Sequence, residues 1–418
     1  MNKKVNINRS NKCVNYEDLT KEELIARLKT LEAHNFQLKN IISKSLNEKS
    51  VSKPKNNKSF DFSRCSTRHI LLKILYLGWN YQGFTVQENT TDTIEHFLFE
   101  ALERTCLIQS RTTSNYHRCG RTDKGVSSFA QVISITVRSG LVKEKQDQLN
   151  EELNYCKLLN RILPKEIQCI AWKPVPDEFS ARFDCKSRTY KYFFPKGNLN
   201  IENMQSASQY LLGVHDFRNF CKMDVGNGVV EFIRNVSEVN IEPIHSEGYT
   251  DEYNMFVLTI RSGGFLWHQI RCVVGILLLI GQNKESPEII QELLDIEKNP
   301  CKPDYNMASE VPLNLYSSEY ETDCDWQYDS ENLTTIIENL REMWSFSSIK
   351  SSMLRCMIDN LVKELENPDI KCLSENVVHG VKPRNYIPLM KRQKCDSLEK
   401  KMDHYVKRMK LIIKKGNE

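Results

Sequence analysis

The stretch His117–Val126 constrains this chain more than any other, because it places one carboxylate, Asp123, in a turn that leads straight into a strand. Glycines stand close on both sides of Asp123, and glycine tolerates backbone conformations that other residues resist. Over residues 130–137, apolar side chains alternate with polar ones, which predicts a half-buried strand. Asp123 is therefore expected on a loop that feeds a sheet, where a carboxylate can approach a substrate closely.

Asp123 is the leading candidate for a catalytic group. Arg121 and Lys124 flank it, and neighbouring cations keep a carboxylate ionised, as a nucleophile requires. The competing interpretation is an Asp in a surface turn that is satisfied by its own backbone, and an isolated Arg-Thr-Asp would favour it. The residues that follow Asp123 decide between the two.

The string G-R-T-D-K-G-V-S-S-F-A-Q-V over residues 120–132 resembles the signature of the TruA-type tRNA pseudouridine synthases. The resemblance implies that Asp123 is the nucleophile that attacks the target uridine. Many family members carry His where this chain has Ser127, and Ser is typical of the eukaryotic branch that modifies uridines 38 and 39 of the anticodon stem-loop. By the same resemblance, three nearby cations are expected to bind the substrate: Arg118, Arg121 and Lys124.

An aromatic strand over 187–194 carries the next part of the resemblance. Its sequence S-R-T-Y-K-Y-F-F has a period of two, which puts four side chains on one face: Arg188, Tyr190, Tyr192 and Phe194. Tyr192 and Phe194 are expected in the core of the sheet. Tyr190 aligns with the family Tyr that stacks on the target base, where an aromatic platform is worth about 1–3 kcal/mol per base; its hydroxyl could also handle a proton. Two arginines of this region are expected to bind substrate: Arg182 and Arg188.

Residues 266–281 predict a helix, because apolar side chains recur at helical spacing and Gly281 is placed as a C-terminal stop. The run is too short and too interrupted to span a bilayer. The string F-L-W-H-Q-I-R resembles a family helix whose Arg pairs with the catalytic Asp, so Arg271 is expected to pair with Asp123, and His268 to bind substrate. Burial in a base pocket can raise a carboxylate pKa by ~3–5 units from ~3.9, whereas a close Arg lowers it by ~1–3. Arg271 is therefore expected to keep Asp123 charged; the alternative is an Arg that reaches from the helix to the surface.

Two further segments complete the resemblance. Residues 213–222 contain the neighbours His215 and Asp216, but adjacent residues seldom form a catalytic pair, so this segment is assigned to structure, with Lys222 expected to touch RNA. The string M-A-S-E-V-P-L over 307–313 matches the region that closes the catalytic domain.

The fold implied by the resemblance is α/β (α+β), with two similar sheet-plus-helix halves, 68–195 and 196–320, that form a central RNA-binding cleft. An N-terminal helix, 1–42, and a basic flexible linker, 43–67, are expected before it. A C-terminal helical extension with a basic tail, 321–418, is expected after it. The residue patterns by themselves support only strands mixed with helices.

The N-terminal helix carries a heptad-like seam of Leu24, Leu28, Leu31, Asn35, Leu38 and Ile42. This seam predicts a dimerising coiled coil, so the expected assembly is a homodimer. A single amphipathic helix packed on the core would show the same pattern, and fewer than three full heptads are marginal alone.

Positive charge gathers near the C-terminus, although the net charge of the chain is only +4. Residues 391–415 hold ten Lys or Arg on a predicted helix, and charge of one sign gathered there grips phosphates better than the same total spread evenly. A solvated basic tail is the alternative. The candidates for contact with the tRNA backbone are Lys400, Lys401, Lys407, Arg408 and Lys410.

No cofactor and no metal is expected, because the implied reaction breaks the N1 glycosidic bond, turns the uracil and rejoins it through C5. Attack at C6 and attack at C1′ both stay open. The fourteen cysteines include no C-x-x-C pair, which argues against zinc knuckles and for reduced thiols in the nucleus and cytoplasm. No signal core and no membrane segment is expected.

Other functions compete with pseudouridine synthesis at positions 38 and 39. A non-catalytic tRNA-binding protein should lack Asp123 or Arg271, and both are present. A hydrolase with an Asp nucleophile would need a D-x-D pattern or a second paired acid, and neither stands out. A family member that acts at other tRNA positions is the remaining alternative.

Overall fold

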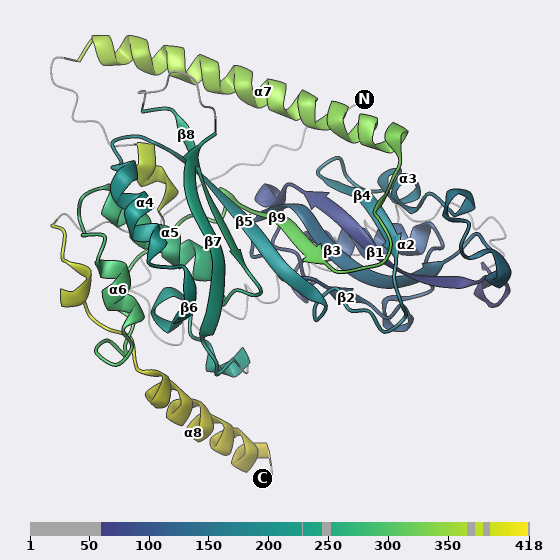
Figure 1. The fold of residues 1–418 in the computed structure, drawn as a ribbon, viewed down its shortest axis with the longest axis horizontal. Coiled ribbons are helices and arrows are strands. Elements are labelled where there is room, and N and C mark those ends of the chain that lie inside the picture. Colours follow the sequence, from purple (N-terminus) through teal and green to yellow (C-terminus); the bar gives the residue numbers. More distant parts are fainter. Residues whose placement is uncertain (1–59, 228, 245–251, 366–372, 379–384, 417–418) are drawn as a thin grey trace, which may run out of the picture. The chain divides into compact units, whose positions relative to one another are not determined.

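In the described part of the chain, ten strands form one mixed sheet in the order β10-β4-β1-β3-β9-β5-β8-β7-β6, with β2 beside β3. Figure 1 labels the strands from β1 to β9. The computed structural model describes residues 60–227, 229–244, 252–365, 373–378 and 385–416. The strands are β1 (Thr67–Tyr76), β2 (His117–Arg118), β3 (Ser127–Arg138), β4 (Ile167–Pro174), β5 (Cys185–Pro195), β6 (Gly213–Asp216), β7 (Ile233–Pro243), β8 (Met255–Ser262), β9 (Leu313–Tyr320) and β10 (Gln327–Tyr328). The helices are α2 (Ile94–Arg104), α3 (Tyr155–Asn160), α4 (Ile201–Gln209), α5 (Gln269–Gly281), α6 (Ile289–Leu294), α7 (Ser330–Lys363) and α8 (Leu398–Gly416). The mixed α/β class predicted from the sequence is confirmed.

The chain divides into a unit that ends at Asp61 and a second unit, Phe62–Glu418. The predicted N-terminal helix and coiled coil, 1–42, lie outside the described residues. So does most of the predicted linker, 43–67. The ordered sheet begins with β1 at Thr67.

Strand β1 is the centre of the first half, antiparallel to β3 and β4. Its alternate residues Ile70, Leu72 and Ile74 are fully buried in one core with Leu98 of α2 and Leu159 of α3. Burying one such side chain contributes about 1.5–3 kcal/mol. These three residues therefore share the face of β1 that is turned toward the helices, while Leu71 is buried on the other face.

The second half has its own core, built on β5, β8 and β7, which pair antiparallel. Tyr192 and Phe194 of β5 are buried in this core, as the sequence predicts. Helix α5 is buried on nearly every side and packs against α4, which accounts for a helix that is apolar almost all round. It begins at Gln269, three residues later than the apolar spacing predicts.

Strand β9 joins the two halves. It runs parallel to the first residues of β3, where Ser127 pairs with Asn314, and antiparallel to β5, where Tyr190 pairs with Leu315. Strand β5, expected in the first half, thus pairs with β9 and β8 of the second. The sheet passes from one half to the other between β3 and β5, at the point where the loop that carries Asp123 enters β3.

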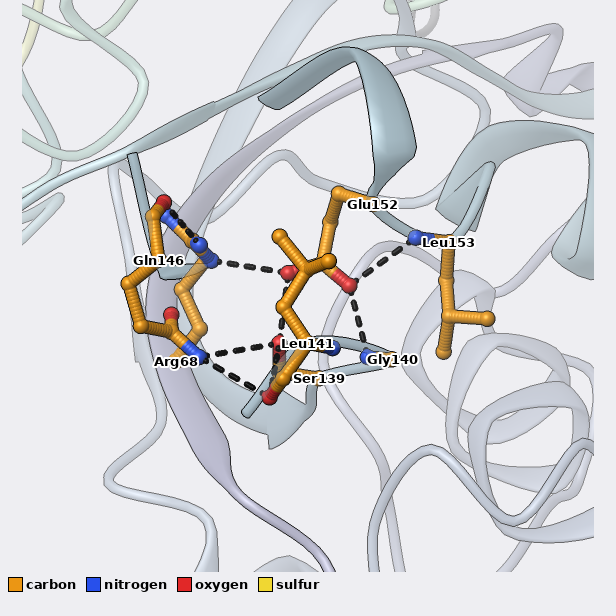
Figure 2. A network of polar contacts seen from close by, with 7 residues as sticks. All are labelled: Arg68, Ser139, Gly140, Leu141, Gln146, Glu152 and Leu153. Carbon is orange, nitrogen blue, oxygen red and sulfur yellow. Dashed lines mark hydrogen bonds and ion pairs between the residues drawn. The ribbon is translucent and has the colours of Figure 1, made fainter. Parts of the chain in front are cut away.

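A buried carboxylate, that of Glu152, links the loop after β3 to the start of β1 through hydrogen bonds and an ion pair (Figure 2). It accepts hydrogen bonds from the Ser139 hydroxyl at 2.6 Å and the Gly140 and Leu153 amides at 2.7 and 2.9 Å, and pairs with Arg68 at 3.0 Å. Burial by itself would raise the pKa of Glu152, but these four partners outweigh it and hold the pKa below its usual range. Glu152 is therefore ionised and fully bonded in the folded protein.

The C-terminal extension, predicted from residue 321, contains α7 and α8. Asp329 caps α7 by accepting from the Asn332 amide at 2.7 Å. The first turns of α7 are tied to the first half, where Lys157 pairs with Glu331 at 2.6 Å, and Arg355 near its end lies over the Tyr253 ring of the second half. None of the helices in the described ranges is long and apolar enough to cross a membrane.

Candidate active site

The loop that carries Asp123 is a tight turn built on Gly125. The Val126 amide donates to the Asp123 carbonyl at 3.2 Å, and Gly125 has φ +78° at the position where a type II turn needs a positive φ. The preceding turn after β1 packs directly on this loop: a Cβ at Gly78 would lie 1.9 Å from the Val126 carbonyl oxygen. A larger residue at Gly78 would therefore displace the loop of Asp123.

Hydrogen bonds anchor the same loop to the end of β1. The hydroxyls of Tyr76 and Thr122 bond to each other at 2.7 Å, and Ser127 Oγ accepts from the Gly78 amide at 2.9 Å. The Gly125 amide donates to the Tyr81 carbonyl at 3.1 Å. Ser127, the position at which many family members have His, is thus a buried structural contact in this chain.

Both carboxylate oxygens of Asp123 face donors from consecutive residues. The Trp267 indole Nε1 donates to Oδ1 at 3.3 Å, and His268 Nε2 lies 3.2 Å from Oδ2. His268 directly precedes α5 and has φ +60°, a left-handed conformation that residues other than glycine rarely adopt. The carboxylate itself stays about one third exposed, at 33%, so a substrate can reach it.

The electrostatic surroundings favour the ionised form of Asp123. Burial by itself would raise its pKa, but the hydrogen bond and charge of His268, the charge of Arg271 and the Trp267 hydrogen bond outweigh this and lower the pKa below its usual value. Asp123 is therefore a carboxylate at neutral pH, as a nucleophile must be.

The predicted direct pair between Arg271 and Asp123 is wrong. Arg271 Nη2 instead donates to Glu310 Oε2 at 2.8 Å, and its Nε donates to the Ala308 carbonyl at 2.8 Å. The segment before β9 brings a carboxylate and a carbonyl to the buried guanidinium, and these occupy its donors. Arg271 acts on Asp123 through space, while His268 and Trp267 make the contacts. The alternative of a surface-reaching Arg is also wrong, because Arg271 is buried.

Asp123 opens into a cleft of about 540 Å³. Arg121 and Lys124 are exposed on its lining, and neither makes a side-chain hydrogen bond or ion pair within the described ranges. The other lining residues come from the turn after β1, from the Asp123 loop and from the segments that hold Arg271: Gln82, Gly83, Phe84, Thr85, Gln87, Thr122, His268 and Glu310. The cleft thus combines an ionised carboxylate with two cations that are available to a ligand.

Tyr190 lies half-buried on β5, with its ring edge-on to Phe265 at 5.3 Å between centroids. Burial raises the pKa of Tyr190 well above its usual range, and Cys119, Tyr76 and Asp123 raise it further. The phenol is therefore neutral, and it is close enough to Asp123 for the two to interact electrostatically. Tyr190 does not line the cleft as it stands.

Arg188 donates hydrogen bonds to backbone carbonyls of three different loops. Its Nη2 donates to the Cys119 carbonyl at 2.9 Å and to the Arg182 carbonyl at 3.1 Å, and its Nη1 donates to the Gly263 carbonyl. It therefore links the Asp123 loop to the loop that leads to Trp267. The Arg182 guanidinium is exposed and lies 5.2 Å from the Phe183 ring.

Arg118, predicted to bind substrate, forms an ion pair with the buried carboxylate of Glu95. Its Nη1 lies 2.6 Å from Glu95 Oε1, and the same carboxylate receives Arg111 at 3.2 Å and the Tyr116 hydroxyl at 2.7 Å. The Glu95 side chain is fully buried, so it requires these partners. The structure therefore gives Arg118 a structural role.

In the segment 213–222, His215 and Asp216 make structural contacts. Asp216 pairs with Arg218 at 2.6 Å, and His215 bonds to the Leu212 carbonyl at 2.7 Å, so the two neighbours do not form a dyad with each other. Lys222 lies beside the site, with its Nζ 4.2 Å from the centroid of the Trp267 ring.

The basic tail forms α8, on which Lys400 and Lys407 are exposed and Lys401 is partly exposed. The side chains of Arg408 and Lys410 lie outside the described residues. Among the residues that are described, no group of three or more His, Cys, Asp or Glu is arranged to hold a metal ion.

Sequence reasoning missed the roles of Trp267 and Glu310. Both lie inside strings that were recognised, F-L-W-H-Q-I-R and M-A-S-E-V-P-L, but spacing along the chain does not show which oxygen or cation they reach. An indole next to a His at a helix start was the available signal for Trp267.

Comparison with known proteins agrees with the geometry. Residues 207–321 match the family described as tRNA pseudouridine synthase. The chain is 44% identical to the tRNA pseudouridine(38/39) synthase of Homo sapiens, over 93% of this chain and 88% of that protein. The protein of the same name from Saccharomyces cerevisiae is 40% identical, over 78% of this chain and 77% of its own length. The tRNA pseudouridine synthase A of Methanosarcina mazei is 28% identical, over 63% and 89%.

Proposed function

This chain belongs to the tRNA pseudouridine synthase family, and from that premise we propose that it isomerises uridines 38 and 39 of the tRNA anticodon stem-loop to pseudouridine, with Asp123 as the nucleophile. The choice of positions is supported by relatives at 44% and 40% identity that are named for positions 38 and 39. Ser127, typical of that branch, supports the same choice.

One observation carries the proposal: an ionised, one-third exposed carboxylate stands in a cleft that also holds two exposed cations, Arg121 and Lys124. Arg121 and Lys124 suit the phosphates that flank a uridine, since Lys and Arg are the usual partners of phosphate. A binding protein without catalysis has no need of a carboxylate at this place, because a negative charge in the cleft repels RNA.

In the proposed reaction the N1–C1′ bond of the uridine breaks and a C5–C1′ bond forms. The proton leaves C5 and N1 gains one, so the overall change is an isomerisation. Asp123 forms a covalent intermediate with the nucleotide and is released unchanged. The uridine must first leave its stack, at a cost of a few kcal/mol, and the Tyr190 ring would offset part of this by stacking on the uracil. The neutral Tyr190 hydroxyl would serve proton transfer near Asp123.

The test uses Asp123→Asn, which keeps the size of the side chain and removes its nucleophilic charge. Single-turnover release of tritium from C5 of labelled uridine in tRNA should fall below detection, while tRNA binding stays within about a few fold, because only one group of the interface changes. Asp359→Asn makes the same chemical change on α7 and should keep the wild-type rate. Turnover by Asp123→Asn near the wild-type rate would refute the proposal.

We also propose that the protein is a homodimer and that α7 forms its interface. Between Phe346 in α7 and Leu365, two residues beyond the end of the helix, the chain presents an apolar face with exposed fractions between 38% and 68%. This α7 face consists of Phe346, Met353, Leu354, Met357, Ile358, Leu361 and Leu365. The opposite, polar side of α7 meets the protein body, where Arg355 pairs with Asp359 and lies over Tyr253.

A second copy suits the α7 face better than RNA does. Side chains of this number and size present on the order of 800 Å², close to the roughly 800 Å² per partner of a stable interface. Residues 354, 358, 361 and 365 follow the 4-3-4 spacing by which two helices pack together. The same face on both copies gives a closed, two-fold symmetric contact.

Light scattering on the purified protein tests the dimer. Wild type should have twice the chain mass, and a double substitution of Leu354→Glu and Leu361→Glu should have the mass of one chain. Ser352→Glu introduces the same charge on the polar side of α7 and should remain a dimer. A monomeric wild type, or a dimer unaffected by the double substitution, would exclude this interface.

We further propose that the protein works in both nucleus and cytoplasm. The cysteines in the described ranges are all free thiols, which suits reducing compartments. Imaging of a fluorescent fusion in cells checks this.

A further inference from the structure

Trp267 and His268 present donors to the two oxygens of one carboxylate, although they are consecutive residues. In a regular helix, consecutive side chains diverge by about 100°, so a helical start could not aim both at Asp123. The left-handed backbone at His268, with φ +60°, allows this convergence. A rare backbone conformation at His268 indicates that directing both side chains at Asp123 has a function in the site.

Lys222 contacts Trp267 through both its backbone and its side chain. Its amide donates to the Trp267 carbonyl at 3.0 Å, and its ammonium lies 4.2 Å from the centroid of the indole ring. Within the described ranges, this ammonium has no carboxylate partner. Its charge is therefore directed at the indole, whose N–H points to Asp123.

We propose that Trp267 is a positioning residue for Asp123, and that Lys222 acts on the carboxylate through the Trp267 indole. A cation over an indole draws on the electron density of the ring, which makes the N–H a stronger donor. A neutral donor holds one oxygen in place and leaves lone pairs of the carboxylate available for attack. This inference rests on the proposed function of Asp123.

Several other charged or titratable groups face Asp123 and remain in place when Trp267 or Lys222 is changed. His268 and Arg271 approach from the side of α5, and Arg121 and Lys124 belong to the loop of Asp123 itself. Glu310 approaches from the segment before β9, and Tyr190 from β5. A change in the pH profile of a Trp267 variant would therefore report the lost indole N–H.

The experiment compares Trp267→Phe, Lys222→Met and the double variant in single turnover with tRNA, across pH, with binding measured on the same preparations. Trp267→Phe keeps a ring beneath Lys222 and loses only the N–H. Its rate should fall about tenfold, the order expected for losing a hydrogen bond to a charged group. The acid limb of its pH profile should move to higher pH, because losing a donor raises the pKa of the carboxylate. Its tRNA affinity should stay within about twofold.

Lys222→Met should lower the rate less and shift the acid limb in the same direction, and Lys222→Arg should restore both, since a guanidinium also stacks on indole. In the Trp267→Phe background, Lys222→Met should cause no further loss, because its effect passes through the N–H that is already absent. Lys222 is exposed, so its variants should fold even if Trp267→Phe does not.

Two results would overturn the proposal. One is a Trp267→Phe enzyme with the wild-type rate and pH profile. The other is a Lys222→Met effect confined to tRNA affinity and equal in both backgrounds, which would make Lys222 a phosphate contact. Failure of the proposed function is distinguishable, because the wild-type enzyme would then release no tritium before any variant is compared.

Discussion

Arg271 should be coupled energetically to Glu310 far more strongly than to Asp123. The structure places Arg271 Nη2 2.8 Å from Glu310 Oε2, with side chains only 8% and 20% exposed. Because solvent screens this pair little, a hydrogen bond between two charged groups should contribute about 1.5–3 kcal/mol. Arg271→Met should cost at least about 1.5–3 kcal/mol of unfolding free energy, because it removes the guanidinium that donates to the Glu310 carboxylate.

Urea unfolding of the tRNA-free protein measures this coupling in a double-mutant cycle of Arg271→Met and Glu310→Gln. The double variant should be more stable than the sum of the single effects predicts, by about the 1.5–3 kcal/mol of the lost bond. A second cycle pairs Arg271→Met with Asp123→Asn. Arg271 affects Asp123 only through space, so this coupling should stay below about 1 kcal/mol.

A larger coupling in the second cycle would contradict the pairing of Arg271 with Glu310. That result would restore the direct pair between Arg271 and Asp123 that the sequence resemblance implies. It would also mean that Glu310→Gln hardly changes the free energy of unfolding, whereas the contact with Arg271 predicts a loss of stability.

Three other outcomes are expected. Tyr190→Phe should keep base stacking and lose only proton handling, whereas Tyr190→Ala should lose both, measured by tRNA binding and single-turnover rate on the same preparations. Folding lowers the pKa of Glu152, so the ionised carboxylate stabilises the protein above its unfolded pKa of ~4.3, and this stability is lost as pH falls through the folded pKa. Glu152→Gln should therefore lower the free energy of unfolding near neutral pH. In acid unfolding titrations, the difference between this variant and wild type should shrink. Charge reversal at Lys400, Lys401 and Lys407 should weaken tRNA binding and reduce its salt slope by about one per lost phosphate contact; an unchanged slope would make α8 a solvated tail.

The sequence by itself determined the local chemistry of this protein. The glycines near Asp123 and the strand that follows required a tight turn entering a sheet, and both are present. The period of two in β5 placed Tyr192 and Phe194 in the core, because successive side chains of a strand must face opposite sides. The apolar spacing over residues 266–281 likewise predicted a helix, and only its start differs.

Only the tertiary structure decided which groups meet. Arg271 bonds to Glu310 instead of Asp123, Arg118 bonds to Glu95, and Trp267 rather than Arg271 donates to Asp123. Each choice depends on distances between segments that are far apart in the chain, and on the insertion of β9 between β3 and β5. A buried charge bonds to the carboxylate or carbonyl that packing brings within about 3 Å, and spacing along the sequence carries no information about that distance.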